Sequence, residues 1–247
     1  VDTYNTAVGY AAGKQITSGV QNTLIGSLAG DALTEGIRNV AVGYNALSAE
    51  TEGKQIVAIG NDALAVYNIG DNDGNLVAIG YQAASSMTTG SQSIIIGALA
   101  GNALTTGSNN TVLGYNALGV ETTGSRAVAI GANALGNQSF NGDSYNIAVG
   151  HDAGRQITTG TRNTIIGGLA GDALTTGHYN VALGFGALST EDDHGTNVAI
   201  GYSALLLQNA GADAYNVAVG YNAGKAVTTG IYNTILGASA GDALTTG

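Results

Sequence analysis

The sequence has no cysteine, no proline and few charged residues. Without cysteine there is no disulfide bond and no thiolate metal site. The 40 glycines do not recur at every third residue, which together with the lack of proline excludes a collagen helix. Only seven lysines and arginines face 17 aspartates and glutamates, and a net charge of −10 argues against binding to nucleic acid or to an anionic membrane.

What remains is a composition typical of a folded chain. Hydrophobic residues make up 44% of the sequence and charged residues 10%, which is too apolar for a disordered protein. No run approaches the roughly 18 apolar residues of a transmembrane helix, so we expect no membrane insertion. An acidic surface that is poor in charge suits an extracellular location, and we predict that location here.

A short motif that ends in glycine recurs through the whole chain, and fixed-period repetition of this kind indicates a solenoid or a similar repeat architecture. We number each copy from the glycine that closes "AVG", "AIG" or "IIG", which is position 0. The spacing is 17 residues, except for 20 after Gly60 and 19 after Gly131 and Gly201. Position +3 is always alanine and position −1 is always Val, Ile or Leu. The copies lie at Gly9, Gly26, Gly43, Gly60, Gly80, Gly97, Gly114, Gly131, Gly150, Gly167, Gly184, Gly201, Gly220 and Gly237.

A longer period is superimposed on the short one. Position +4 is small in the first two copies of each group of four and leucine in the last two, as in Gly13, Gly30, Leu47 and Leu64. Four coils therefore form a unit of about 70 residues, and the extra residues follow the fourth coil. The units cover approximately 1–71, 72–141, 142–211 and, in part, 212–247.

Segments such as "NTAVGY" are short, aliphatic and β-branched, which favours strands over helices. We predict an all-β, parallel β-roll or β-solenoid of about 14 coils, with 1–247 forming one continuous domain. Each coil is expected to have a first strand at positions −4 to +1, a second strand at about +6 to +9, and a turn closed by glycine at +10.

The first strand is apolar on both faces, and such strands need cover on both. Positions −3 and −1 point one way, and positions −2 and 0 point the other. We expect Ile166, at position −1, to pack inside the coil, and a stripe of Ala, Ile and Gly to stay exposed. The small residues of this stripe would allow the backbone of another subunit to approach closely, and we predict a homotrimer.

Several columns of equivalent residues are expected to interact between neighbouring coils. Asn at position −4 and Thr at positions +8 and +9 predict hydrogen-bond ladders. The tyrosines at +1 and −5 are expected to pack over the coil corners, with sugar or receptor contact as the alternative. Position +5 predicts exposed ion pairs that mark the register: Lys14 with Asp31, Arg155 with Asp172 and Lys225 with Asp242.

The inserts after the fourth coils are "YNIGDNDGN", "SFNGDSY" and "NAGADAY". Loops on a rigid scaffold are where binding usually occurs. "DNDG" resembles part of a calcium loop but lacks the downstream Glu of an EF-hand, so a plain surface turn is the favoured interpretation. The candidate receptor contacts in these inserts are Tyr67, Asp71, Asp73, Phe140, Asp143 and Asp213.

No motif predicts an enzyme. The histidines His151, His178 and His194 are spread over three coils, and Glu191–His194 is a local variant of "ETEG" and "ETTG" in sister coils. We therefore predict no catalytic triad, no zinc site and no cofactor. The GxxxG strings are by-products of the repeat, and no phosphate-binding fingerprint occurs in a strand–turn–helix context.

The run "VAIGxxAL" at 57–64, 128–135 and 198–205, with its "NTAVGY" variants, resembles the head repeats of YadA-like trimeric autotransporter adhesins. Similar arrays occur in bacteriophage tail-fibre proteins. The resemblance covers all fourteen coils, although the 17-residue coils are longer than the usual adhesin head repeat. It implies a left-handed parallel β-roll that trimerises and binds a host surface protein or glycan. The absence of a neck, stalk, anchor and cap from the sequence predicts a segment of a longer fibre.

Three functions are compatible with these observations. The first is a structural and adhesive segment of a trimeric extracellular fibre, which supplies length, rigidity and a receptor-binding surface. The second is a purely structural shaft module whose binding is done elsewhere. The third is a monomeric solenoid that binds ice, glycan or calcium, although the interrupted threonine rows speak against ice.

Overall fold

The computed structural model describes residues 3–247, and the chain divides into two compact units, Val1–Ser125 and Arg126–Gly247. Both units are built from parallel strands, one to a coil, and no helix occurs among residues 3–247. The first unit contains β1 (Thr6–Val8), β2 (Thr23–Ile25), β3 (Val40–Val42), β4 (Lys54–Ile59), β5 (Asp73–Ile79), β6 (Ile94–Ile96) and β7 (Thr111–Leu113). The second contains β8 (Val128–Ile130), β9 (Ile147–Val149), β10 (Thr164–Ile166), β11 (Val181–Leu183), β12 (Val198–Ile200), β13 (Val217–Val219) and β14 (Thr234–Leu236).

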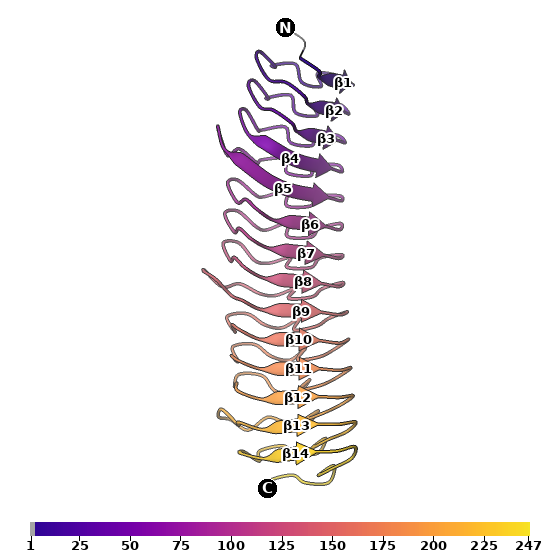
Figure 1. Cartoon of the computed structure of the whole chain (residues 1–247), viewed down its shortest axis with the longest axis vertical. Helices are drawn as coiled ribbons and strands as arrows, with labels where there is room; N and C mark the ends of the chain where they lie inside the picture. The colour runs from indigo at the N-terminus through magenta and orange to yellow at the C-terminus, as the bar shows by residue number, and fades with distance from the viewer. Residues whose placement is uncertain (1–2) are drawn as a thin grey trace. The chain divides into compact units, whose positions relative to one another are not determined.

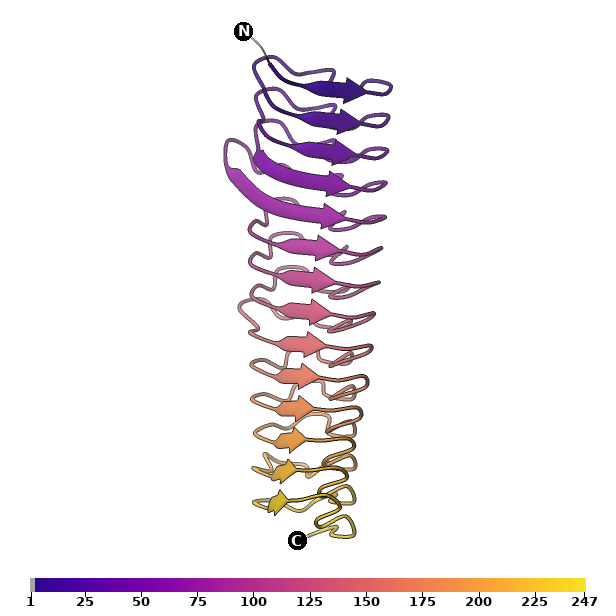
Figure 2. The same cartoon turned by 45° about the vertical axis from the view of Figure 1, so that its right-hand side comes forward.

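Within each unit, every strand pairs in parallel with the strand of the next coil, as Figure 1 shows. Equivalent positions of the repeat face one another, so that Ala41 pairs with Ala58 and Ile165 pairs with Ala182. This confirms the parallel β-solenoid and the register predicted from the 17-residue period. The insert after the fourth coil lengthens β4 and β5, which are the two longest strands in Figure 2, and the pairing shifts between Lys54 and Ile56.

The prediction of a second strand in each coil was wrong. Positions +6 to +9 form turns and irregular backbone, and the single strand usually covers only positions −3 to −1. The reason is the backbone ahead of that segment. Positions +2 and +4 have φ near +55° in coil after coil, as in Asn45 (58°) and Leu47 (54°), and a left-handed conformation cannot continue as an extended strand.

The packing inside the coils explains the four-coil unit. In the coils between the first and the last, positions −2, +4 and +7 are all buried in the interior. In the second coil, a Cβ on Gly30 would lie 2.8 Å from Leu33 and 2.9 Å from Leu24, so only glycine fits between these two leucines. In the third coil Ala41 takes the place of Leu24, and Leu47 fills the volume that is released. The seventy-residue period is therefore an alternation of core volume.

Polar ladders join the coils at positions −4 and +8, as predicted. The Oδ1 atom of Asn163 accepts the backbone N–H of Asn180 at 2.9 Å, and its Nδ2 donates to the carbonyl of Gly177 at 2.8 Å. The same bonds recur at other copies of position −4, all of them buried or partly buried. At position +8 the threonine hydroxyl donates to the carbonyl of the equivalent residue in the next coil, as from Thr88 to Thr105 at 3.1 Å. These bonds satisfy backbone groups that strands would otherwise pair.

Candidate interaction surface

The outward face of the strands is formed by positions −3 and −1, and position −2 faces the interior. Ile165 is fully buried, whereas Ile166 is only half-buried. The prediction that Ile166 packs inside the coil was therefore wrong by one residue. The interior is already filled by positions +4 and +7, so the third inward position is alanine in most coils, and the larger β-branched residues lie outside.

Large apolar side chains consequently line the outside of both units. Away from the two end coils, their exposed fractions are still high for such residues and reach 49% for Ile94 and 43% for Leu113. Position −1 is Val, Ile or Leu in every coil, whereas position −3 is threonine in five of the fourteen. Exposed apolar side chains that recur in this way are unusual on a monomeric protein and indicate an interaction surface. We call these the outer apolar rows; their most exposed internal members are Ile25, Ile94, Leu113, Ile147, Leu183 and Val217.

The glycines of position 0 serve contacts within the chain. Each has φ between +122° and +141°, which L-residues rarely adopt. A Cβ on Gly9 would lie 2.5 Å from the carbonyl oxygen of Gly26 in the next coil. The expected stripe of Ala, Ile and Gly at positions −2 and 0 is thus not an exposed surface for another subunit, because its members fill the interior or touch the neighbouring coil.

Aromatic side chains border the outer apolar rows. At position +1 of unit two, the rings of Phe185, Tyr202 and Tyr221 stack on successive coils, with centroids 5.7 and 5.3 Å apart. Before the strands, at position −5, Tyr215 and Tyr232 stack at 5.3 Å. These five rings stay about half-exposed or more, so they stack on one another and not over buried corners.

Arginine side chains cover two further rings of the −5 row. Arg126 lies 5.8 Å above the ring of Tyr145, and Arg162 lies 5.5 Å above that of Tyr179. Both distances are within the range of a cation–π contact. Together with the stacked rings, these contacts form a regular array of aromatic and arginine side chains beside the outer apolar rows in unit two.

Tyr67 is placed differently from the prediction. It occupies position +7 and is fully buried, so it is not available to a receptor. Its hydroxyl has no hydrogen-bond partner, and burial, with a smaller effect of the Glu50 carboxylate, raises the pKa of this phenol well above its usual value. The repeat register could have predicted this burial, because Tyr67 occupies the same position as the interior residues Leu33 and Met87.

The other insert residues lie at or near the surface. Asp71 and Asp73 are exposed in the first insert, where Asp71 pairs with Lys54 and raises the pKa of that lysine. Asp143 and Phe140 are half-buried, and Asp143 pairs with Arg126. Asp213 is exposed, and its Oδ1 accepts the N–H of Gly195 at 2.9 Å.

Of the predicted inter-coil ion pairs, one is formed. Lys14 Nζ lies 3.7 Å from Asp31 Oδ2. Within residues 3–247 neither Arg155 with Asp172 nor Lys225 with Asp242 makes an ion pair. Burial raises the pKa of Asp172, and the charge of Arg155 offsets this only in part. The register is set by the backbone pairing and does not depend on these charges.

A column of buried glutamates was not predicted from the sequence. They stand at position +7 in the third coil of each four-coil unit. They are Glu50, Glu121 and Glu191, and all three are fully buried. The Oε1 atom of Glu50 accepts the N–H groups of Thr51, Glu52 and Gly53, which closes the turn. The sequence contained a signal for this column. Position +7 is apolar in the first two coils of each complete unit, and an acidic residue stands there in the third coil, about every seventy residues.

No family model, no curated protein and no solved structure matches this chain. Residues 3–247 contain no pocket, so the candidate surface is the outer face described above. In the same range, no helix has the length and apolar character to span a membrane.

Proposed function

We propose that this chain is a structural and adhesive segment of a trimeric extracellular fibre, of the kind that bacterial surface adhesins and phage tail fibres form. The observation that supports it best is the pair of outer apolar rows, with Ile94 and Leu113 about half-exposed. Exposed rows of this size favour burial against a partner. Length and rigidity come from the stacked coils, and recognition of a host protein or glycan is assigned to the inserts.

The partner for the outer apolar rows is a second and a third copy of the same chain. The rows repeat once per coil, in register with the parallel pairing. A partner that covers them along their length must repeat with the same spacing, and a copy of the chain does so by construction. Three copies around a common axis would each offer the same face, which gives closed symmetry and leaves the corners free.

The corners provide the adhesive part of the proposal. Asp71, Asp73 and Asp213 are exposed on equivalent inserts. They would recur along the fibre, so weak contacts at single inserts would add up through multivalency. Host surface protein or glycan is the proposed ligand, because the chain is acidic and poor in the basic residues that nucleic acid requires.

Light scattering of the full chain tests the assembly. A trimer has a mass of 3 × 24.4, or about 73 kDa, and a monomer stays near 24.4 kDa. A monomer at all concentrations would contradict the proposal and favour a single solenoid that binds ice, glycan or calcium. A trimer that binds neither host cells nor a glycan array would favour the second candidate, a shaft module that only spaces other domains.

A further inference from the structure

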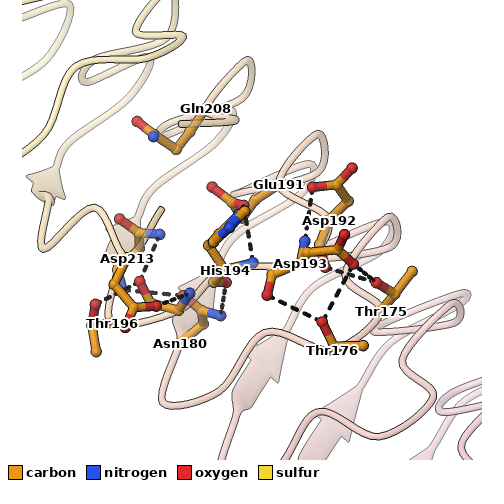
Figure 3. Close-up of polar contacts among 12 residues, drawn as sticks. Thr175, Thr176, Asn180, Glu191, Asp192, Asp193, His194, Thr196, Gln208 and Asp213 are labelled. Carbon is orange, nitrogen blue, oxygen red and sulfur yellow. Dashed lines mark hydrogen bonds and ion pairs between the residues drawn. The ribbon is translucent and has the colours of Figure 1, made fainter. Parts of the chain in front are cut away.

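The corner between β11 and β12 differs from its two sister corners. In those corners the buried Glu50 and Glu121 are followed three residues later by Gly53 and Gly124. In the third, Glu191 is followed at the same distance by His194. Figure 3 shows His194 beside Glu191, with Asp192 and Asp193 on the same turn.

The buried carboxylate of this corner is under-satisfied. Glu50 uses both of its oxygens, since Oε1 accepts three N–H groups and Oε2 accepts the N–H of Ile69 at 3.0 Å. In contrast, Oε1 of Glu191 accepts the N–H of His194 at 3.3 Å, and Oε2 is buried without a hydrogen-bond partner. A buried carboxylate oxygen with no partner is costly, and it is a good ligand for a cation.

Two more buried polar atoms of this region lack hydrogen bonds, one on His194 and one on Gln208 of the next coil. The Nδ1 atom of His194 lies 3.5 Å from Oε1 of Glu191 and has no hydrogen-bond partner. In the next coil, Gln208 is fully buried at the position that follows Glu191 in its column, and its Nε2 is also unpartnered. The ligand atoms of Glu191, Asp192 and His194 all lie within 4.8 Å of one another.

Asp193 is not a member of this group. Its carboxylate is directed to the hydroxyls of Thr175 and Thr176, as the dashed lines in Figure 3 show. Asp192, by contrast, is half-buried, and only its Oδ1 is bound to a backbone N–H, that of Asp193 at 2.8 Å. The three candidate ligands thus come from one turn.

We propose that Glu191, Asp192 and His194 bind a divalent transition-metal ion, and Zn²⁺ in particular. Imidazole nitrogen and carboxylate oxygen are both ligands of zinc, and three protein ligands leave the fourth position to water. Ligand atoms of a tetrahedral zinc site lie about 3.3 Å apart, given metal–ligand distances of about 2.0–2.2 Å. Asp192 and His194 are partly exposed, so their side chains can close in on the buried Glu191.

An ion at this point would bind atoms that lack hydrogen bonds within the protein. It would coordinate a Glu191 oxygen and a ring nitrogen of His194, and thereby replace missing hydrogen bonds with metal ligation. Calcium and magnesium are less suited, because they prefer oxygen ligands and higher coordination numbers. This proposal depends on unit two alone and holds whether or not the chain trimerises.

The test is calorimetric titration of Zn²⁺ into the full chain after removal of metals with EDTA. We expect one ion per chain and an increase in melting temperature on binding. His194→Gly restores the glycine of the sister corners, so the fold is expected to persist, and it should weaken Zn²⁺ binding at least 30-fold. The matched control is His151→Ala, because His151 also lies beside a carboxylate, 3.3 Å from Asp152, and this variant should bind as the wild type does.

Two results would overturn the proposal. One is equal Zn²⁺ affinity of the wild type and of His194→Gly, with circular dichroism in EDTA confirming that both are folded. The other is no binding of Zn²⁺ by the wild type at 100-fold excess over the protein. Ca²⁺ that binds as tightly as Zn²⁺, and is unaffected by His194→Gly, would also contradict it.

Discussion

A Cβ built on Gly167 would lie 2.5 Å from the carbonyl oxygen of Gly184 in the next coil. Gly167 also has a φ of +136°. Close approach and unusual backbone together make glycine necessary here. We expect Gly167→Ala to destabilise unit two by about 2–4 kcal/mol, measured by chemical denaturation. Gly211→Ala is the control: its φ is +69° but nothing lies within 4 Å, so only the conformational cost of about 1 kcal/mol should appear. Equal losses in the two variants would contradict the steric explanation.

The asparagine ladder should carry a large share of local stability. Asn163→Ala leaves the N–H of Asn180 and the carbonyl of Gly177 buried without partners. We expect a loss of about 2–4 kcal/mol, together with faster hydrogen exchange at Asn180. Asn137 donates to Gln156 at 2.7 Å on the exposed surface, and Asn137→Ala should change stability by less than about 0.5 kcal/mol. A loss of that small size for Asn163→Ala would show that the ladder is not required.

Asp172 should make stability depend on pH in a specific direction. Burial raises the pKa of its carboxyl above the ordinary value of 3.8, and Oδ1 has no partner. A raised pKa in the folded state favours the protonated form, so the stability it contributes is present below pH 3.8 and is lost as pH rises through the folded-state pKa.

Asp172→Asn should therefore be more stable than the wild type at pH 7, by on the order of 1 kcal/mol, and the gain should vanish near pH 3. Thermal unfolding between pH 3 and pH 7 measures the difference. The equivalent Asp31 has a lysine partner at 3.7 Å, so Asp31→Asn should give no gain at pH 7. A gain for Asp172→Asn that does not change with pH would contradict the assignment.

The buried hydroxyl of Tyr67 should be dispensable. It has no hydrogen-bond partner in a fully buried site. Tyr67→Phe removes that polar atom and keeps the ring, so stability should stay the same or rise by up to about 1 kcal/mol. Tyr67→Ala, which removes the ring, should cost about 3–5 kcal/mol. A severe loss in Tyr67→Phe would reveal a partner for the hydroxyl, and retained stability in Tyr67→Ala would contradict burial.

The outer apolar rows should control association. In the single chain, Leu183 is 40% exposed. In a trimer that covers this row, Leu183→Glu would bury a charge without a partner, and it should weaken association by at least about tenfold in the dissociation constant. Thr190→Glu adds the same charge at an exposed position of the same coil. It should leave the mass of the assembly in solution unchanged. Analytical ultracentrifugation of both variants measures the mass of the assembly. If Leu183→Glu remains a trimer, the interface does not include this row.

The amino-acid sequence by itself determined the repeat, the parallel solenoid, the register and the polar ladders. A fixed period forces equivalent residues to face one another, so pairs such as Ala41 with Ala58 follow from counting. Short strands follow from β-branched residues between glycines. None of these conclusions requires knowledge of which side of a strand is the inside.

Only the tertiary structure decided what faces inward. The strand is apolar on both faces, so alternation alone could not say whether Ile165 or Ile166 is buried. The answer depends on how much of the interior positions +4 and +7 already fill. The residues at positions +2 and +4 have left-handed backbone, which turns the chain so that position +7 faces the interior. Tyr67 and Glu191 are therefore buried, and His194 lies beside Glu191.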